Sequence, residues 1–402
     1  NLPGDGVGLR YHFGLFHQVL QKNVQTAQPD PWITDQSWLK KTDTVYTVPF
    51  GTCSVQARMY DILVPGYEND TTNTLHLFDI ETVDETLVKD GIDFDKTAVE
   101  KNLTLFLYPD DSDENGRLLR VYQEYLMVSA GAQLILDECT AKGCQLTDLA
   151  DYAAIQINDT HPALVIPELM RIFMDEAGMN WDEAWDITSR SVAYTNHTVL
   201  SEALERWPQQ LVETLLPRVW QIIQEIARRW QEKVENFFHD PSVTEKMAIV
   251  WGGEVRMANL CVAGGLSVNG VSGLHSEILK KDVFKNSYAM EPWKFTNVTN
   301  GIDHRRWLSE INPGLDGLVR DLAGGDDYLL HPQALKKLDA YADDVTVLKR
   351  LDEIKWQNKV NFADYARKAQ GVTLDPNAIF DVQVKRLHEY KRQLLNVLHI
   401  IT

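Results

Sequence analysis

Cysteine, positive charge and long apolar runs are all scarce in this 402-residue chain, and each scarcity excludes a class of protein. The four cysteines are too few for a disulfide scaffold and match no zinc-binding spacing; they are Cys53, Cys139, Cys144 and Cys261. We therefore expect reduced thiols, a cytoplasmic location and no metal site. No apolar run approaches the roughly 18 residues of a membrane-spanning helix, so we predict no membrane partner.

Acidic residues outnumber basic ones by 58 to 39, which gives a formal charge of -19. Such a surface repels phosphate backbones, so a nucleic-acid partner is not expected. A neutral substrate remains compatible, as does a small anion in a local basic pocket. The length predicts two or three domains, and the composition is that of an ordinary globular protein.

Strand-like and helix-like segments alternate over most of the chain, which predicts an α/β class with a largely parallel sheet. Strands are expected at 45–50, 54–60, 62–64, 74–78, 153–157, 247–251 and 379–384. Helices are expected at 117–139, 162–175, 208–238, 276–281 and over much of 333–369, with Pro217 kinking or dividing the long one. A further apolar helical pattern follows Tyr390.

The most distinctive local feature is KRLHEYKR at 385–392, where half of the residues are Lys or Arg. It lies between an apolar predicted strand and a predicted helix, a usual place for ligand binding in α/β folds. Lys385, Arg386 and Lys391 could converge on a phosphate. The alternative is a solvated basic patch.

Four weaker motifs carry polar groups that could bind a ligand. Asp159 and His161 follow a predicted strand, although NDTHP could equally cap the next helix. His197 in YTNHT could contact hydroxyl groups or be a core histidine. Asn300 precedes a glycine, which is also a turn signal. Asp111 lies in PDDSDENG, an acidic loop that could gate a cleft or be a solvated turn.

Taken together, these segments resemble the α-glucan phosphorylases. The matching stretches are long and cover most of the chain: 8–16, 64–70, 154–171, 193–208, 269–281, 294–308 and 380–396. The resemblance implies a GT-B fold with two Rossmann-like domains and an active site in the cleft between them. Residues 1–298 are then the later part of the N-terminal, glucan-side domain. Residues 299–402 begin the C-terminal domain, which binds the cofactor and phosphate.

The resemblance also implies a reaction, namely phosphorolysis of α-1,4-glucan from its non-reducing end to α-D-glucose 1-phosphate, with retention. Its cofactor is pyridoxal 5′-phosphate, used through the phosphate group. Arg386 and Lys391 resemble the ligands of substrate phosphate, Lys385 lies near the cofactor phosphate, and Tyr390 lies beside them. The implied partners are glucan and inorganic phosphate, with a homodimer as the expected assembly.

On the glucan side, the resemblance assigns His197 a catalytic role, with its carbonyl near the developing positive charge. Asn300, Asp159, His161 and Asp111 resemble substrate-binding groups. Two local sequences depart from the family pattern. Ser112 replaces the usual Asn of the acidic loop, and DHRRW at 303–307 replaces TPRRW.

The chain begins with Asn1 and its last helical pattern has no terminating signal, so we interpret it as an internal segment. The family resemblance then puts a glycine-rich phosphate loop before Asn1 and the Schiff-base lysine after Thr402. We therefore expect the segment alone to be inactive.

Two other interpretations remain open from the residues. One is a nucleotide-sugar glycosyltransferase of the same broad fold, similar to glycogen synthases. The other is a glucan-binding protein without catalysis, against which the three cations Lys385, Arg386 and Lys391 argue.

Overall fold

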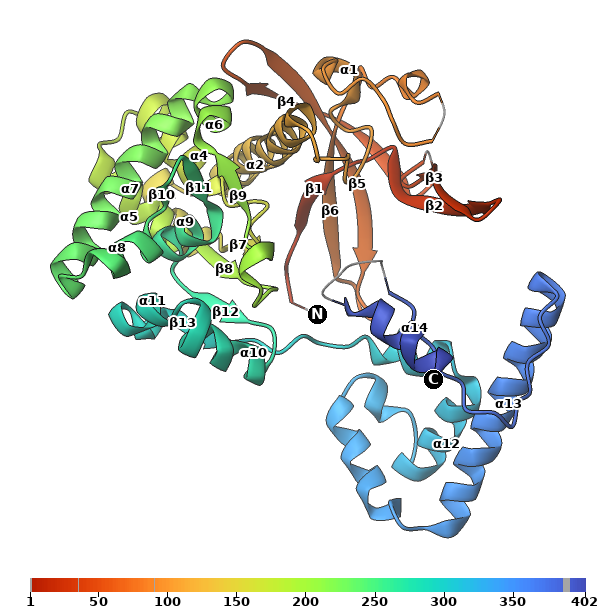
Figure 1. The fold of residues 1–402 in the computed structure, drawn as a ribbon. Coiled ribbons are helices and arrows are strands. Elements are labelled where there is room, and N and C mark those ends of the chain that lie inside the picture. Colours follow the sequence, from red (N-terminus) through yellow and green to blue (C-terminus); the bar gives the residue numbers. More distant parts are fainter. Residues whose placement is uncertain (1, 35, 90, 386–390) are drawn as a thin grey trace. The chain divides into compact units, whose positions relative to one another are not determined.

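The computed structural model describes residues 2–34, 36–89, 91–385 and 391–402, and the chain divides into two compact units (Figure 1). The first unit is Asn1–Asn300 and the second is Gly301–Thr402. The assignment of a glucan-side and a cofactor-side domain to 1–298 and 299–402 stays a prediction, because it concerns function.

The first unit is a mixed α/β structure with two four-stranded sheets. One has the order β1 (Gly6–Leu9), β6 (Thr72–Ile80), β5 (Ser54–Pro65), β4 (Leu39–Pro49). The other is parallel throughout, in the order β13 (Phe295–Asn297), β12 (Val268–Gly270), β8 (Val192–Thr195), β7 (Ile155–Asn158). The predicted parallel sheet is thus present.

The prediction of a largely parallel sheet is nevertheless wrong for the sheet that contains β1, β6, β5 and β4. Strands β4, β5 and β6 pair antiparallel, because short turns join them, and only β1 runs parallel to β6. The remaining strands form two smaller antiparallel sheets. They are β2 (Phe13–Gln21) with β3 (Val24–Pro31), and β9 (Arg206–Pro208) with β11 (Glu254–Arg256) and β10 (Val250–Trp251).

Local sequence signals place the main helices of the first unit. Asp113 caps α2 (Glu114–Ala141) by accepting a hydrogen bond from the Gly116 N–H at 2.7 Å. Pro217 divides the predicted long helix, as expected, because it occupies the first turn of α7 (Pro217–Phe238). The other helices are α1 (Val99–Asn102), α3 (Leu149–Tyr152), α4 (Val165–Arg171), α5 (Trp181–Ser191), α6 (Gln209–Leu215), α8 (Pro241–Met247), α9 (Met257–Gly264), α10 (Gly273–Ile278) and α11 (Lys285–Met290).

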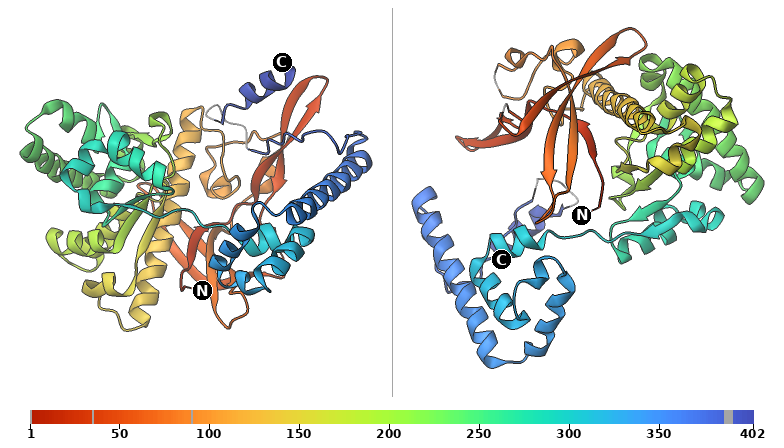
Figure 2. Two further views of the ribbon diagram at one scale, coloured as in Figure 1. Left: turned by 90° about the horizontal axis from the view of Figure 1, so that it is seen from below. Right: turned by 180° about the vertical axis from the view of Figure 1, so that it is seen from behind.

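Helix α2 joins the two halves of the first unit. It contacts β1 and β4 on one side and α4 and α6 on another, and Figure 2 shows it between the antiparallel strands and the surrounding helices. Its centre carries a buried polar hub around Glu168 of α4, which is 0% exposed. The Glu168 carboxylate accepts hydrogen bonds from Tyr125, Ser129 and, bidentately, Arg171. These bonds fix α2 against α4.

The described part of the second unit contains the helices α12 (Pro313–Ala323), α13 (Val345–Gln370) and α14 (Gln393–Ile401). The predicted strand at 379–384 is wrong, because these residues form neither a strand nor a helix. Ile379 and Val384 are 96% and 87% exposed. A parallel strand needs paired neighbours and covered faces, and the described residues of this unit provide no strand to pair with it.

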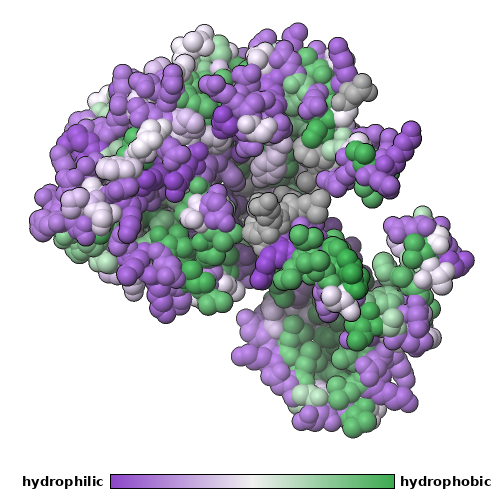
Figure 3. All heavy atoms as spheres, in the orientation of Figure 1, coloured by the Kyte–Doolittle hydropathy of each residue, from purple (hydrophilic) through white to green (hydrophobic). Residues whose placement is uncertain are grey.

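Apolar side chains are also exposed elsewhere in the second unit, as the green surface in Figure 3 shows. Leu394, Leu395 and Ile401 of α14 are among them.

Within the described residues, no helix combines the length and the apolar character needed to cross a membrane. All four cysteines are free, Cys53 exposed and the other three buried, as the sparse cysteine content predicts.

We predict that Glu168→Ala destabilises the protein by about 3–5 kcal/mol, because it leaves the mostly buried Arg171 guanidinium without its main partner. Urea-induced unfolding of the full-length protein measures the loss. Glu176→Gln is the matched control, since Glu176 pairs with the same arginine but is 56% exposed. It should cost less than about 1 kcal/mol. Equal losses for the two variants would contradict a buried hub.

Candidate active site

The carboxyl ends of the parallel strands bring three of the predicted motifs to one edge of the sheet. Asn158 of β7 aligns with Thr195 of β8, Thr195 with Asn269 of β12, and Gly270 of β12 with Asn297 of β13. The loops that follow contain Asp159 and His161, then His197, then Asn300. This edge is the usual binding position in parallel α/β sheets.

Asp159 makes the sharp turn that follows β7. Its backbone has a φ of +65°, in the left-handed region that aspartate tolerates better than most residues. Its N–H donates to the Thr195 carbonyl at 3.0 Å, and its Oδ1 accepts from the Thr160 N–H at 2.7 Å. The turn buries Thr160 and starts the segment that carries His161. The side chain thus has a local role in the turn, but the helix-cap alternative is wrong, because α4 begins at Val165 and has no side-chain cap.

His197 is exposed on the next loop, so the core-histidine alternative is wrong. Its Nε2 lies 2.6 Å from Asn158 Oδ1, which joins the loops after β7 and β8. The residue before it, Asn196, is fully buried and bonded to Tyr194 and His275. The buried amide therefore anchors the loop that presents His197.

Asn300 lies at the other end of the same edge. It is exposed, and its N–H donates to the Val271 carbonyl at 3.0 Å. Gly270 lets helix α10 approach this edge closely, because a Cβ there would lie only 2.6 Å from the Ser276 hydroxyl. His197 and Asn300 thus extend from β8 and β13, with β12 between them.

Asp111 and His161 line a shared cavity of about 610 Å³. The acidic loop around Asp111 is partly structural, because Asp113 caps α2 and Lys96 pairs with Asp110 and Asp113. The cavity wall is strongly charged; its lining also includes Tyr108, Arg117, Arg120, Glu202, Glu205 and Arg206. Two separate sequence motifs therefore meet in one pocket.

Two glutamates that sequence reasoning missed lie next to His161, Glu205 in the cavity lining and Glu124 outside it. His161 Nδ1 lies 3.1 Å from Glu205 Oε2 and 3.5 Å from Glu124 Oε1. Glu124 is buried and also accepts from Arg120 at 3.1 Å and from Trp207 Nε1 at 3.3 Å. Glu124 lies within an otherwise continuous helical pattern, so the only available signal was a charged residue on a largely buried helix.

The pKa values in this cluster follow from burial and charge. Hydrogen bonds from His161 to Glu124 and Glu205 raise the pKa of the histidine to about 10. Burial, and then the charge of Glu205, raises the pKa of Glu124. The pKa of Glu205 is lowered because hydrogen bonding to His161 and Glu124 outweighs the opposing effect of burial. At neutral pH His161 is therefore an imidazolium.

The predicted phosphate ligands belong to the second unit. Lys385 is exposed and Lys391 is partly buried. Arg386 and Tyr390 lie outside the described residues. The convergence of these residues on a phosphate, and their approach to the residues of the first unit, stay predictions.

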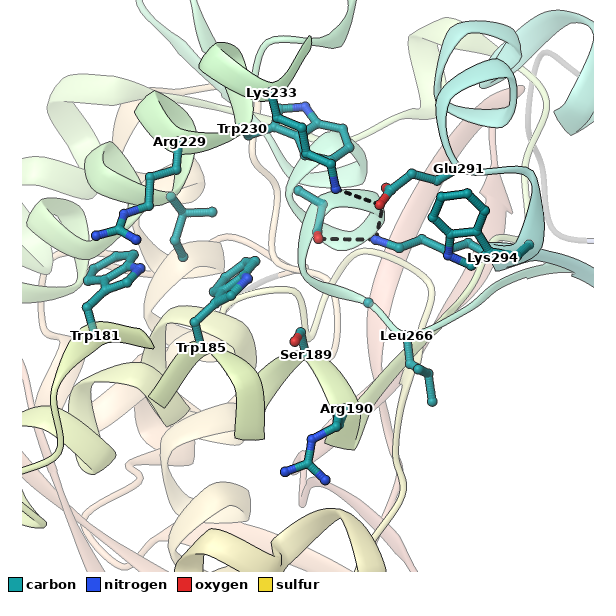
Figure 4. Close-up of a pocket in the computed structure, with 14 residues that line it drawn as sticks. Trp181, Trp185, Ser189, Arg190, Arg229, Trp230, Lys233, Leu266, Glu291 and Lys294 are labelled. Atoms are coloured by element: carbon teal, nitrogen blue, oxygen red, sulfur yellow. Dashed lines mark hydrogen bonds and ion pairs between the residues drawn. The ribbon is translucent and has the colours of Figure 1, made fainter. Parts of the chain in front are cut away.

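A second cavity, of about 330 Å³, contains none of the predicted site residues. Figure 4 shows Trp181 and Trp185 projecting from α5, with Arg229 of α7 against Trp181. At its other end, Glu291 is bonded by Lys233 and Lys294, and Lys294 Nζ also donates to the Val262 carbonyl near the end of α9. The charged groups at this end of the cavity thus pair with one another.

Comparison with known proteins gives a match to the family model for carbohydrate phosphorylases over residues 1–402. The chain belongs to this carbohydrate phosphorylase family. Among curated relatives, the maltodextrin phosphorylase of Streptococcus pneumoniae is 50% identical over 400 residues. The muscle glycogen phosphorylase of Homo sapiens is 42% identical over 436 aligned residues, and the glycogen phosphorylase of Bacillus subtilis is 41% identical over 422.

Each of these phosphorylases is matched by the whole of this chain, which covers 52% of the relative's own length. The chain therefore spans about half of a typical curated phosphorylase. The predicted resemblance to the α-glucan phosphorylases is confirmed at the level of the family. The roles of individual residues are not tested by this similarity.

We predict that His161 makes the stability of this phosphorylase-family protein depend on pH. Its folded pKa is raised to about 10, above the usual value of about 6.5 for an unfolded chain. The stabilisation is therefore complete below pH ~6.5 and is lost as the pH rises towards ~10. Urea unfolding across this range should show that His161→Gln removes this loss from the stability profile. An unchanged profile would mean that the histidine is not held charged.

Proposed function

We propose that the full-length protein degrades α-1,4-glucan by phosphorolysis at the non-reducing end and releases α-D-glucose 1-phosphate with retention. The observation that carries the proposal is family membership over residues 1–402, together with relatives named maltodextrin and glycogen phosphorylase. The proposed architecture is a GT-B fold with two Rossmann-like domains, 1–298 and 299–402 each contributing a part. The active site lies in the cleft between those domains.

The proposed glucan-binding groups are those at the carboxyl edge of the parallel sheet and in the adjoining cavity. Glucose is neutral and rich in hydroxyl groups, so it is recognised by side chains that donate and accept hydrogen bonds. Exposed His197 and Asn300 supply such groups at the edge. Asp111 and His161 supply them in the cavity, and Asp159 holds the turn before His161. The His197 carbonyl is proposed to stabilise positive charge on the sugar.

The proposed phosphate ligands are Arg386 and Lys391, with Lys385 near the cofactor phosphate and Tyr390 beside them. Guanidinium and ammonium groups bind phosphate through charge-assisted hydrogen bonds. Preorganised cations also stabilise a transition state in which phosphate attacks an oxocarbenium-like sugar. Support comes from the KRLHEYKR motif, whose cations stand out in a chain of net charge -19.

We propose pyridoxal 5′-phosphate as the cofactor on the basis of the family alone. When bound, its phosphate group supplies acid–base chemistry next to the substrate phosphate. The described residues around Lys385 do not by themselves fit such a group, because the preceding segment is exposed and unpaired, with Val384 87% exposed.

The names of the relatives favour phosphorolysis over the two alternatives, a nucleotide-sugar glycosyltransferase similar to glycogen synthases and a glucan-binding protein without catalysis. We also propose a cytoplasmic homodimer without nucleic-acid or membrane partners. The free cysteines and the acidic composition support this proposal.

The full-length protein should shorten maltodextrin only when inorganic phosphate is present, because phosphate is the attacking group. The assay measures glucose 1-phosphate and free glucose separately, with pyridoxal 5′-phosphate supplied and with the cofactor removed. Removal of the cofactor should abolish turnover. Release of free glucose at a comparable rate without phosphate would identify a hydrolase. A requirement for a nucleotide sugar would identify the glycosyltransferase alternative.

Arg386→Ala should weaken phosphate use in the full-length protein at least tenfold, since a buried charge-assisted contact typically contributes more than about 1.4 kcal/mol. The measurement is kcat/KM for phosphate at saturating maltodextrin. Lys336→Ala is the control, because Lys336 is an exposed cation of the same unit outside the motif. Unchanged phosphate saturation in Arg386→Ala would remove this arginine from the site.

A further inference from the structure

The protonation of His161 decides what the cavity can offer to a ligand. Its Nδ1 faces Glu205 and Glu124, and no hydrogen bond from the opposite ring nitrogen, Nε2, is seen to any of the described residues. A neutral ring with its proton on Nδ1 would present Nε2 as an acceptor, whereas an imidazolium presents Nε2–H as a donor. The two states therefore select different ligand atoms.

The framework around His161 is largely buried and comes from separate elements. Glu124 lies in α2, and its side chain is 2% exposed. Glu205 directly precedes β9, where its carbonyl accepts from the Met257 N–H at 3.1 Å. Trp207 of β9 donates to Glu124 at 3.3 Å, so the two glutamates are also tied to each other's elements. His161 itself is 39% exposed and lines the cavity.

The charges of the cluster favour the imidazolium. One oxygen of each glutamate and a ring nitrogen of His161 lie within 4.8 Å of one another. Burial and the charge of Glu205 raise the pKa of Glu124, and a positive charge on His161 favours the ionised form of both carboxyl groups. Arg120 pairs directly with Glu124 at 3.1 Å, and its charge also helps to lower the pKa of Glu205. The other charged or titratable groups that face the cluster are Tyr11 beside Arg120, Asp159 on the preceding turn, and Tyr108, Asp111, Arg117, Glu202 and Arg206 in the cavity wall.

We propose that Glu124 and Glu205 are positioning residues that hold His161 as an imidazolium, with Nε2–H available as a donor to a glucan hydroxyl oxygen. This inference rests on the proposed function only for the identity of the ligand. A charged donor forms a stronger hydrogen bond with a hydroxyl oxygen than a neutral one does. The glutamates act through the histidine, and Glu124 lies outside the cavity lining.

The first test follows the titration of His161 by NMR in the full-length protein labelled with ring-¹³C and ¹⁵N histidine. The resonance is identified by its absence in His161→Gln. In the unmodified protein it should remain that of an imidazolium to above about pH 8. Glu205→Gln should lower the midpoint by more than about one unit, because it removes the nearer negative charge. Glu213→Gln, an exposed glutamate of α6, is the control and should leave the midpoint unchanged.

The second test measures KM for maltodextrin against pH. The KM of the unmodified protein should be flat between about pH 6 and pH 8, whereas that of Glu205→Gln should rise roughly tenfold as the histidine loses its charge. Glu124→Gln tests the second carboxylate in the same way and should show a smaller rise, because Glu124 is the more distant from Nδ1.

A neutral His161 at pH 7 in the unmodified protein would overturn the inference, as would a KM that rises equally at every pH in Glu205→Gln. The NMR titration of the unmodified protein does not require activity. A charged histidine in a protein without phosphorolysis would therefore support the positioning role while rejecting the proposed function. Phosphorolysis with a neutral histidine would do the reverse.

Discussion

The register of the parallel sheet is the constraint on which the candidate site depends. Asn158, Thr195, Gly270 and Asn297 end their strands at nearly the same level, so the loops that follow emerge at one edge. A shift of one residue in any strand would turn its side chains to the opposite face of the sheet. The hydrogen bond between His197 and Asn158 exists because β7 and β8 keep this register. Four distant sequence segments thereby share one surface.

Helix α2 supplies the second constraint, because successive turns of the same helix serve different purposes. Arg120 faces the cavity and bonds to the buried Glu124, while Tyr125 and Ser129 bond to the buried carboxylate of Glu168. The packing of α2 on α4 therefore also sets where Glu124 meets His161. Buried charges are tolerated here because each has a partner, as Arg171 is for Glu168 and Arg120 for Glu124.

Charge at the cavity contrasts with charge over the whole molecule. The chain carries a net -19, yet Arg117, Arg120, Arg206 and a protonated His161 line the space that Asp111 and Glu205 also face. A cavity with donors and acceptors of both signs suits a neutral, hydroxyl-rich ligand better than a highly charged one. Membership in the carbohydrate phosphorylase family agrees with this chemistry.

The sequence by itself determined the α/β class, the main helices and the family. Pro217 divided the predicted long helix, and the helical pattern at 117–139 predicted most of α2, because both are local signals. The same local signals predicted a strand at 379–384 that did not form, since a parallel strand depends on neighbours distant in the sequence. Only the tertiary structure brought Glu124 and Glu205 to His161. Glu124 and Glu205 are 81 positions apart, and no spacing pattern in the sequence connects them. Contacts between distant buried charges depend on helix packing and strand register, which a one-dimensional pattern does not contain.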